Sequence, residues 1–280
     1  MHHAVQIKNL LSPNMVGIFT KMKLAILNAA LLPAYRKHIK QSPAEILNEL
    51  EKVETPVDYF KFYNAVSSVY SSKIEGEDID FDSFFKYKFM RIRYQPDYTK
   101  KADDLYAAYQ FIFKNKLTLK KLQKVHGVLS ASLLPKSQQG FIRINPMFVI
   151  NNNDRIEYVA TEPSKVKAEL KKLFTDIKTL QAASLNAYEI FYYAAYIHLV
   201  FVKIHPFQDG NGRTARLLEK WFLIKKMGDK ATAVQLEKNY YKNLTNYYSN
   251  IKQIGSEYEQ LNYAACLPFL LMTVTGMREQ

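Results

Sequence analysis

The chain contains very little cysteine. Its 280 residues include one, Cys266, which excludes an internal disulfide framework and a cysteine-rich zinc cluster. Because nothing in this composition indicates an oxidising compartment, we expect a cytoplasmic protein.

Long hydrophobic runs are missing as well. The most apolar stretches, residues 190–202 and 266–274, are shorter than the roughly 20 residues that a helix needs to cross a bilayer. Residues 1–14 lack the charged start, apolar core and small-residue cleavage site of a signal peptide. We therefore predict no membrane span and no export.

Acidic residues are scarce relative to basic ones. The chain has 26 Asp and Glu against 39 Lys and Arg, a formal charge of +13. Such a field attracts polyanions, whether nucleic acid, nucleotide phosphates or an acidic protein surface. Solvated helix faces of a lysine-rich protein explain any single basic cluster equally well, so charge alone does not identify the partner.

No Gly/Ser-rich linker, low-complexity tract or internal repeat divides the chain. Apolar residues recur at helical spacing through most of it, which predicts a mainly α fold. The helical segments that we expect are residues 22–39, 43–53, 59–74, 101–115, 119–134, 164–181 and 187–203. The simplest organisation is an N-terminal helical region over residues 1–101 packed on a helical core over residues 102–280.

One segment of this core changes period. Over residues 140–163, β-branched and aromatic residues flank the turn-forming sequence at 151–154. We predict a β-hairpin here, with strands near residues 147–150 and 155–159.

The most informative stretch is HPFQDGNGRTAR, residues 205–216. It follows an apolar helix that Pro206 helps to end. The DGNG sequence tolerates a tight bend that turns successive backbone N–H groups inward. A second helix is expected from Arg213 onward, and its positive N-terminal end faces this bend. The pattern predicts a binding nest for phosphate.

Charged side chains around this nest fit phosphate chemistry. Arg213 and Arg216 share a helix face, where two like charges repel unless a polyanion joins them, so more than one phosphate is implied. Asp209 is a hard oxygen ligand suited to Mg²⁺ that is shared with phosphates. His205 titrates near neutrality and suits a general base. Together these residues predict phosphate-ester transfer to a hydroxyl.

Simpler interpretations of the same residues exist. A histidine before proline is commonly a capping or packing residue, GNG is commonly a turn, and paired arginines commonly form surface salt bridges. His205 and Asp209 could instead bind a metal as a pair, but no third ligand is evident nearby and zinc would not explain both arginines. The sequence contains no Walker-type P-loop.

The stretch resembles the signature of the Fic family, H-x-F-x-[D/E]-G-N-G-R-x-x-R, at every fixed position. The resemblance extends to the preceding apolar helix, the helix at 119–129, the hairpin and the later sequence NYYKNL, and so covers about residues 56–250. It implies a mainly α, Fic-type helical bundle with a β-hairpin flap over the active site. It also implies transfer of AMP from ATP to a hydroxyl of a target protein, with release of pyrophosphate.

The resemblance assigns a role to each motif residue. His205 would deprotonate the Ser, Thr or Tyr hydroxyl of the target, Asp209 would hold Mg²⁺ that bridges the α- and β-phosphates, and Phe207 would anchor the loop. The remaining motif residues would bind ATP: Asn211 and the backbone N–H groups around Gly210 and Gly212 the α-phosphate, Arg213 the β-phosphate and Arg216 the γ-phosphate.

The hairpin resembles the family's flap, whose exposed backbone pairs with an extended target segment. A hairpin that only covers the core is the alternative, since its strands carry no catalytic side chain. Two tyrosines resemble residues that line the adenine pocket, although core packing explains either one nearly as well in a chain with 20 tyrosines. The implied docking residues are Val149, Ile150, Asn151 and Asn152, and the tyrosines are Tyr240 and Tyr241.

The sequence SSKIEG, Ser71 to Gly76, resembles the inhibitory pattern [S/T]-x-x-x-E-[G/N] of Fic proteins. The resemblance implies an inhibitory helix over about residues 56–76 that places Glu75 against Arg216 and withdraws this arginine from the γ-phosphate. Without the resemblance, the same sequence is only an acidic helix end followed by a turn at Gly76.

We therefore predict a Mg²⁺-dependent protein adenylyltransferase that uses ATP and is autoinhibited by Glu75. We expect self-modification besides an unidentified protein target, and a homodimer is an alternative to a monomer. The first rival function is a Fic-type transferase of another nucleotide or group, because the phosphate nest hardly senses the base. The second is a nucleic-acid-binding regulatory protein with a vestigial nucleotide site, although too few residues follow Met227 for a separate helix-turn-helix domain.

Overall fold

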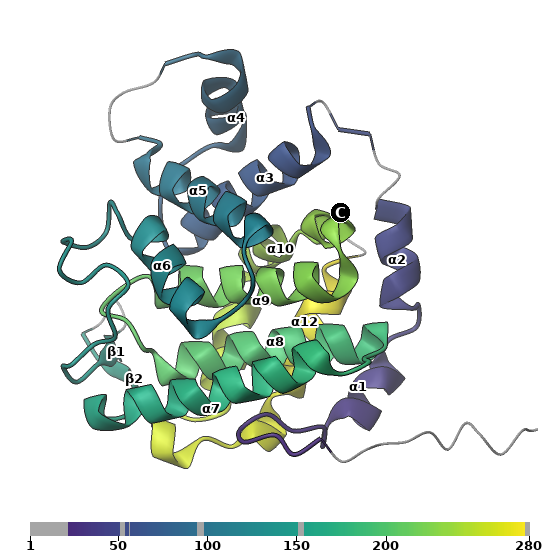
Figure 1. Cartoon of the computed structure of the whole chain (residues 1–280), viewed down its shortest axis with the longest axis vertical. Coiled ribbons are helices and arrows are strands. Elements are labelled where there is room, and N and C mark those ends of the chain that lie inside the picture. The colour runs from purple at the N-terminus through teal and green to yellow at the C-terminus, as the bar shows by residue number, and fades with distance from the viewer. Residues whose placement is uncertain (1–21, 51–53, 56, 94–97, 151–153, 278–280) are drawn as a thin grey trace, which may run out of the picture.

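The computed structural model describes residues 22–50, 54–55, 57–93, 98–150 and 154–277, and these fold mainly into helices (Figure 1). Among the described residues, every helix is too short or too polar to cross a bilayer. The α-helices are α1 (Leu32–His38), α2 (Pro43–Leu50), α3 (Tyr59–Ile74), α4 (Phe81–Met90), α5 (Lys100–Lys114), α6 (Leu119–Leu129), α7 (Pro163–Ala182), α8 (Ala187–Ile204), α9 (Asn211–Met227), α10 (Leu236–Lys242), α11 (Leu244–Lys252) and α12 (Leu267–Thr275). The strands are β1 (Phe148–Ile150) and β2 (Ile156–Val159), and the short 3-10 helices are η2 (Asp229–Ala233), η3 (Tyr258–Gln260) and η4 (Tyr263–Ala265).

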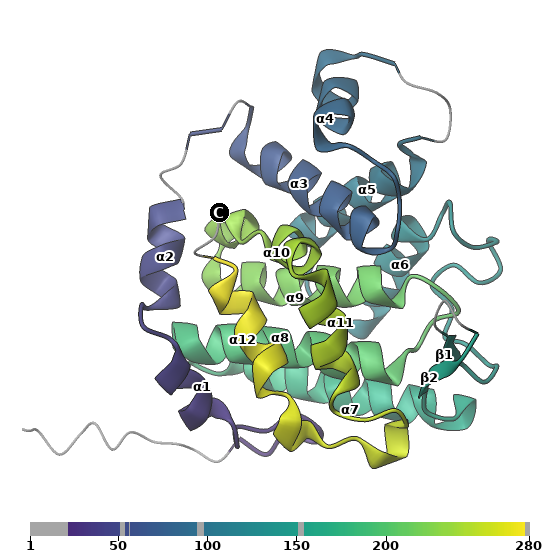
Figure 2. The same cartoon turned by 180° about the vertical axis from the view of Figure 1, so that it is seen from behind.

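Helices α8 and α9 lie side by side at the centre and carry the motif loop between them (Figures 1 and 2). α8 begins at a capping box, in which the Asn186 side chain accepts from the Glu189 N–H and the Glu189 carboxylate accepts from the Asn186 N–H. It ends where His205 adopts a left-handed backbone and Pro206 follows. Gly210, also left-handed, caps the start of α9. Both ends of the loop are therefore fixed by buried helices.

Other helices enclose this central pair. α7 covers one face of α8 and α12 lies on the opposite side, while α5 and α6 pack on α9 (Figures 1 and 2). α3 packs on α5 and α10 and reaches the start of α9. One hydrophobic core runs through these helices and includes Leu47 and Ile74 as well as Leu105 and Met277. The predicted boundary after Lys101, between the N-terminal region and the helical core, therefore cuts through one continuous hydrophobic core. No observation tests this boundary, so it stays a prediction.

The predicted hairpin is present, and it is anchored to the core through β2. β1 and β2 pair antiparallel, with Val149 opposite Tyr158. The Tyr158 hydroxyl donates to the Lys203 carbonyl at 2.6 Å, and the Val159 N–H donates to the Ser256 carbonyl at 2.8 Å. Each strand begins one residue later than expected, and residues 140–147 form no strand.

One predicted helix is mostly wrong. Of residues 22–39, only α1 is helical. The buried Asp176 carboxylate on α7 accepts hydrogen bonds of 2.6, 2.8 and 2.9 Å from the N–H groups of Ala25, Ile26 and Leu27. Pro33 lies in the first turn of α1, where a missing N–H costs nothing. A tertiary contact from α7 thus overrides the helical periodicity of residues 22–31.

Candidate active site

The motif loop is held in shape by its own side chains. Phe207 is fully buried, as the resemblance implies for an anchor of the loop. The Asn211 side chain accepts from the Phe207 N–H at 2.9 Å and donates to the Phe207 carbonyl at 2.8 Å. Both ends of this amide are therefore engaged within the loop. The structure places the Asn211 side chain as a loop brace, which leaves its backbone N–H as the group that can face an anion.

The start of α9 is suited to bind phosphate. Gly210 has φ 76°, and the first N–H groups of a helix have no acceptor in the preceding turn. These groups, with the positive end of the helix dipole, form an anion site. A Cβ atom on Gly212 would lie 2.6 Å from Oε1 of Glu75, so glycine here leaves space that the Glu75 carboxylate fills.

The His205 ring is oriented as a base. Its Nδ1 atom lies 3.1 Å from the Val202 carbonyl, which can only accept, so Nδ1 carries the proton and Nε2 keeps its lone pair. Burial lowers the pKa of His205 to about 4, against a raising effect of the Val202 bond, and the nearby charge of Arg143 lowers it further. The imidazole is therefore neutral at physiological pH and ready to accept a proton.

Arg143 was not predicted, and it connects the flap to the motif loop. Its buried guanidinium donates to four carbonyls, those of His205 at 2.7 Å, Asn145 at 2.8 Å, Thr161 at 2.6 Å and Ile204 at 3.5 Å. Its own N–H donates to the Pro206 carbonyl at 2.9 Å. Arg143 therefore fixes the backbone on which the His205 ring is mounted.

His126 was also missed and supports the other side of the loop. Its ring stacks on Phe207, with centroids 3.6 Å apart. Nδ1 accepts from the Gly140 N–H at 2.9 Å, so Nε2 carries the proton and donates to the Asp209 carbonyl at 2.9 Å. In the sequence this histidine is one of several polar residues of an amphipathic helix, and nothing there signals a contact 83 residues away.

Asp209 has the exposure and chemistry expected of a Mg²⁺ ligand. Its side chain is exposed, and Oδ1 accepts from the adjacent Gly210 N–H at 2.6 Å. Mg²⁺ in phosphate sites uses one or two carboxylates and completes its shell with waters and substrate phosphates. A single exposed carboxylate beside an anion nest fits that donor set.

Glu75 and Arg216 form the ion pair that the resemblance implies. Oε1 of Glu75 accepts from Nη2 of Arg216 at 2.7 Å, and the arginine side chain is 1% exposed. The Ser71 hydroxyl and carbonyl accept from the same guanidinium at 3.0 and 3.1 Å. Burial raises the pKa of Glu75, but the charges of Arg216 and Arg213 outweigh it and hold the pKa below its usual value. Gly76, with φ 84°, follows and turns the chain away.

A second ion pair was not predicted. Oε1 of Glu77 lies 3.2 Å from Nη2 of Arg213 and 2.6 Å from Nζ of Lys101. The Arg213 side chain is 4% exposed, and its Nε atom has no described partner. Both motif arginines are therefore paired with carboxylates from the segment that ends α3.

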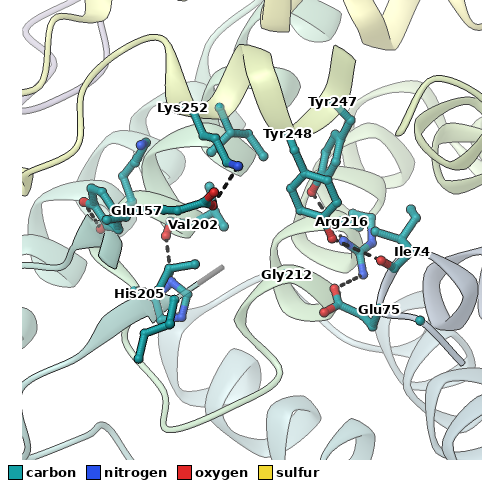
Figure 3. Close-up of a pocket in the computed structure, with 16 residues that line it drawn as sticks. Ile74, Glu75, Glu157, Val202, His205, Gly212, Arg216, Tyr247, Tyr248 and Lys252 are labelled. Atoms are coloured by element: carbon teal, nitrogen blue, oxygen red, sulfur yellow. Dashed lines mark hydrogen bonds and ion pairs between the residues drawn. The ribbon is translucent and has the colours of Figure 1, made fainter. Parts of the chain in front are cut away.

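His205, Glu75 and Arg216 line a cavity of about 820 Å³ (Figure 3). His205 lies on one side of it, and Arg216 with Glu75 lies on the other. Val149 and Ile150 of the flap also line the cavity, whereas Asn151 and Asn152 lie outside the described residues. The rest of the lining comes from α3, β2, α8, α9 and α11: Ile74, Gly76, Glu157, Tyr158, Val202, Lys203, Gly212, Tyr247, Tyr248, Ile251 and Lys252.

The two tyrosines predicted for the adenine pocket do not line this cavity. Tyr240 is fully buried, and its hydroxyl donates to the Glu219 carboxylate at 2.9 Å. Tyr241 is half-buried against Tyr70, with ring centroids 5.7 Å apart. The tyrosines that line the cavity are Tyr158 of β2 and, one helix further along the chain than Tyr240, Tyr247 and Tyr248 of α11. A run of closely spaced tyrosines does not reveal which of them faces a cavity, because that depends on how α10 and α11 pack.

Comparison with known proteins finds similarity to Fic proteins in the part of the chain that carries the motif. Residues 116–223 match the family model described as Fic/DOC family. A 33-residue segment is 61% identical to Protein adenylyltransferase Fic of Drosophila persimilis, and it spans 12% of this chain and 6% of that protein.

Solved structures of Fic proteins share the fold. A Fic family protein from Desulfovibrio desulfuricans G20 aligns at 16% identity with a TM-score of 0.72, over 92% of this chain and 74% of that one. Fic-1 (residues 134–508) from C. elegans aligns at 16% identity with a TM-score of 0.63, over 90% of this chain and 71% of that one. The mainly helical architecture with its small two-stranded sheet is thus a Fic fold.

Proposed function

Because residues 116–223 form a Fic/DOC family domain, we propose that this protein is a protein adenylyltransferase. It transfers AMP from ATP to a Ser, Thr or Tyr hydroxyl of a target protein. The observation that carries the proposal is the cavity in which His205, with an unprotonated Nε2, lies across the start of α9 from Arg216. A base, a phosphate nest and an approach for a protein segment meet there.

The transfer begins with the phosphates of ATP along the start of α9. The backbone N–H groups from Asn211 to Arg213 bind the α-phosphate, Arg213 the β-phosphate and Arg216 the γ-phosphate. Nε2 of His205 accepts the proton of the target hydroxyl. The hydroxyl oxygen forms a bond to the α-phosphorus, the bond from that phosphorus to the bridging oxygen breaks, and pyrophosphate leaves with this electron pair.

Mg²⁺ held by Asp209 neutralises phosphate charge when it is bound. The chain's own residues provide the rest of the site. Arg143 and His126 hold the loop from two sides, so that the ring of His205 and the backbone donors do not need to reorganise.

The ion pair of Glu75 with Arg216 supports autoinhibition of this activity. The guanidinium has one set of donors, and the carboxylate and the γ-phosphate compete for it. While Glu75 holds Arg216, ATP binds weakly or with its α-phosphate misaligned for attack. A charge-assisted interaction of about 1.5 to 3 kcal/mol would lower activity roughly 10- to 150-fold.

The flap supports a protein as the acceptor. Among the described strands, β1 pairs only with β2, so its outer edge is available for an extended segment. Val149 and Ile150 of this strand reach the cavity that contains His205. The same edge is close enough to the base to make hydroxyls of a second copy, or of this chain, acceptors in self-modification.

Transfer from labelled nucleotide tests the proposal. Glu75→Gly and wild type are incubated with Mg²⁺ and with ATP labelled at either the α- or the γ-phosphate, and UTP and GTP are run in parallel. We expect protein-bound label from α-labelled ATP only, in greater amount for Glu75→Gly, and none for Glu75→Gly with His205→Ala. Protein-bound label from γ-labelled ATP, or a preference for UTP or GTP, would indicate another Fic-type reaction instead of adenylyl transfer. Salt-dependent DNA binding without any transfer would favour a regulatory nucleic-acid-binding protein.

A further inference from the structure

The guanidinium of Arg216 has partners on two sides. Those on α3 are Ser71 and Glu75, which accept from Nε and Nη2. On the opposite side, the Tyr247 hydroxyl of α11 lies 3.3 Å from Nη1. Among the described residues, Tyr247 is the one hydrogen-bond acceptor of this guanidinium that does not belong to α3. It also lines the cavity beside Arg216 (Figure 3).

Tyr247 is the first member of a buried chain of hydrogen bonds. Its hydroxyl lies 3.0 Å from Nε2 of His198, and Nδ1 of His198 lies 2.6 Å from Oε2 of Glu219. Because a carboxylate only accepts, Nδ1 of His198 carries the proton and Nε2 accepts from Tyr247. The Tyr247 oxygen is then free to accept from Arg216. The direction of every bond in the chain is thereby fixed.

The chain is rigid and shielded from water. His198 and Glu219 are fully buried, and Tyr247 is 1% exposed. Burial lowers the pKa of His198, so the ring is neutral and keeps this tautomer. The hydroxyls of Tyr240 and Thr273 donate to the same Glu219 carboxylate at 2.9 and 2.7 Å. His198 and Glu219, which orient the Tyr247 hydroxyl, are therefore themselves held in place.

We propose that Tyr247, oriented by His198 and Glu219, is a positioning residue that keeps Arg216 directed at the γ-phosphate of ATP after Glu75 releases it. The inference rests on the proposed function. Loss of the Glu75 carboxylate leaves Arg216 with Ser71 on one side and Tyr247 on the other, and Tyr247 is held by α8, α9 and α11, which belong to the core. Without Tyr247, the freed guanidinium would be held from one side only, by Ser71, and the nucleotide would have to complete its ordering on binding.

The test compares ATP with ADP, since only ATP has a γ-phosphate. In the Glu75→Gly background, Tyr247→Phe keeps the ring and removes the hydroxyl. We expect its Kd for ATP to rise about 5- to 10-fold by calorimetry, its Kd for ADP to change less than about twofold, and its KM for ATP to rise more than kcat falls. Tyr192→Phe is the matched control, because it removes another buried tyrosine hydroxyl, bonded to the Asn28 carbonyl at 3.0 Å. It should change neither Kd.

Two outcomes would overturn the inference: equal losses of ATP and ADP affinity, which indicate a general packing role, or no loss of either. His198→Gln is the second variant, and it should show the same ATP-selective loss to a smaller extent. If Tyr247→Phe does not fold, the ATP and ADP affinities of His198→Gln alone test the inference. The binding measurements need no transfer, so a Glu75→Gly protein that binds ATP and modifies no hydroxyl would refute the proposed function and still report on Tyr247.

Discussion

Glu77 forms an ion pair with Arg213, just as Glu75, two positions earlier in the chain, forms one with Arg216. The second pair has a third member, because Lys101 on α5 lies 2.6 Å from the same Glu77 oxygen. The segment that follows α3 thus occupies both arginines proposed for the terminal phosphates, and it is tied to α5 as well. Full release requires both carboxylates to leave.

The first prediction concerns this second carboxylate. Adding Glu77→Gln to Glu75→Gly should raise transfer a further 2- to 5-fold, because a partly exposed ion pair contributes up to about 1 kcal/mol. Initial rates with α-labelled ATP measure the difference. Asp103→Asn in the same background is the control, since Asp103 pairs with Lys88 and not with the motif. Equal rates with and without Glu77→Gln would show that Arg213 is available to ATP without its release.

The pH dependence of transfer follows from the His205 environment. The folded site lowers the pKa of this ring from 6.5 to about 4, and the neutral ring is the form that would act as the proposed base. We therefore expect kcat/KM of Glu75→Gly to stay level from about pH 8 down to about pH 5.5 and to fall only at lower pH. A buffer series with corrected ionic strength measures this profile. A fall centred near 6.5 would mean that the ring is as accessible to water as a free histidine.

His126 should make stability depend on pH. Burial lowers its pKa from 6.5 to about 4, so below pH 6.5 the unfolded chain binds a proton that the folded chain does not. Stability is then complete above pH 6.5 and is lost as pH falls towards 4, by about 2 kcal/mol at pH 5. His126→Gln keeps a donor for the Asp209 carbonyl and removes this titration. Urea unfolding at pH 7 and 5 should show a smaller pH difference for this variant than for wild type, and identical differences would contradict the assignment.

Arg143 should affect catalysis and stability together. Arg143→Lys keeps the positive charge but cannot reach all four carbonyls, so we expect a loss of about 1 to 3 kcal/mol in the free energy of unfolding. In the Glu75→Gly background, kcat should fall at least tenfold with KM for ATP nearly unchanged, because the base moves while the phosphate nest stays. Single-turnover rates and thermal melts give both quantities. Lys172→Arg on the exposed face of α7 is a surface control that should change neither. An unaltered kcat would show that His205 is placed by the loop alone.

Local patterns made much of the site predictable. Pro206 and Gly210 define where the loop turns, and the apolar periodicity of α7, α8 and α9 defines the helices around it. Glu75 could be predicted only through the resemblance, because its partner lies 141 residues away. The apolar periodicity predicted the helices, but it did not predict how they pack against one another.

Residues that support the site from a distance were not predictable. Arg143 and His126 act on backbone carbonyls, which carry no sequence signal at all. Tyr240 was predicted only through the resemblance, and the packing of α10, which buries it against Glu219, has no local signal in the sequence. The error over residues 22–31 has the same origin, since a single carboxylate on α7 decides their backbone.

Helix α11 touches both ends of the cavity. Its Tyr248 hydroxyl donates to the Ile74 carbonyl at the end of α3, and its Lys252 pairs with Glu157 of β2 at 2.7 Å. A target segment that docks on the hairpin and shifts this helix therefore also changes the surroundings of Arg216. Linkage requires that the target then alters the affinity for ATP by the same factor by which ATP alters the affinity for the target. The affinity for ATP measured with and without the target, and the affinity for the target measured with and without ATP, would therefore give the same coupling free energy. The nine residues of α11 would transmit it.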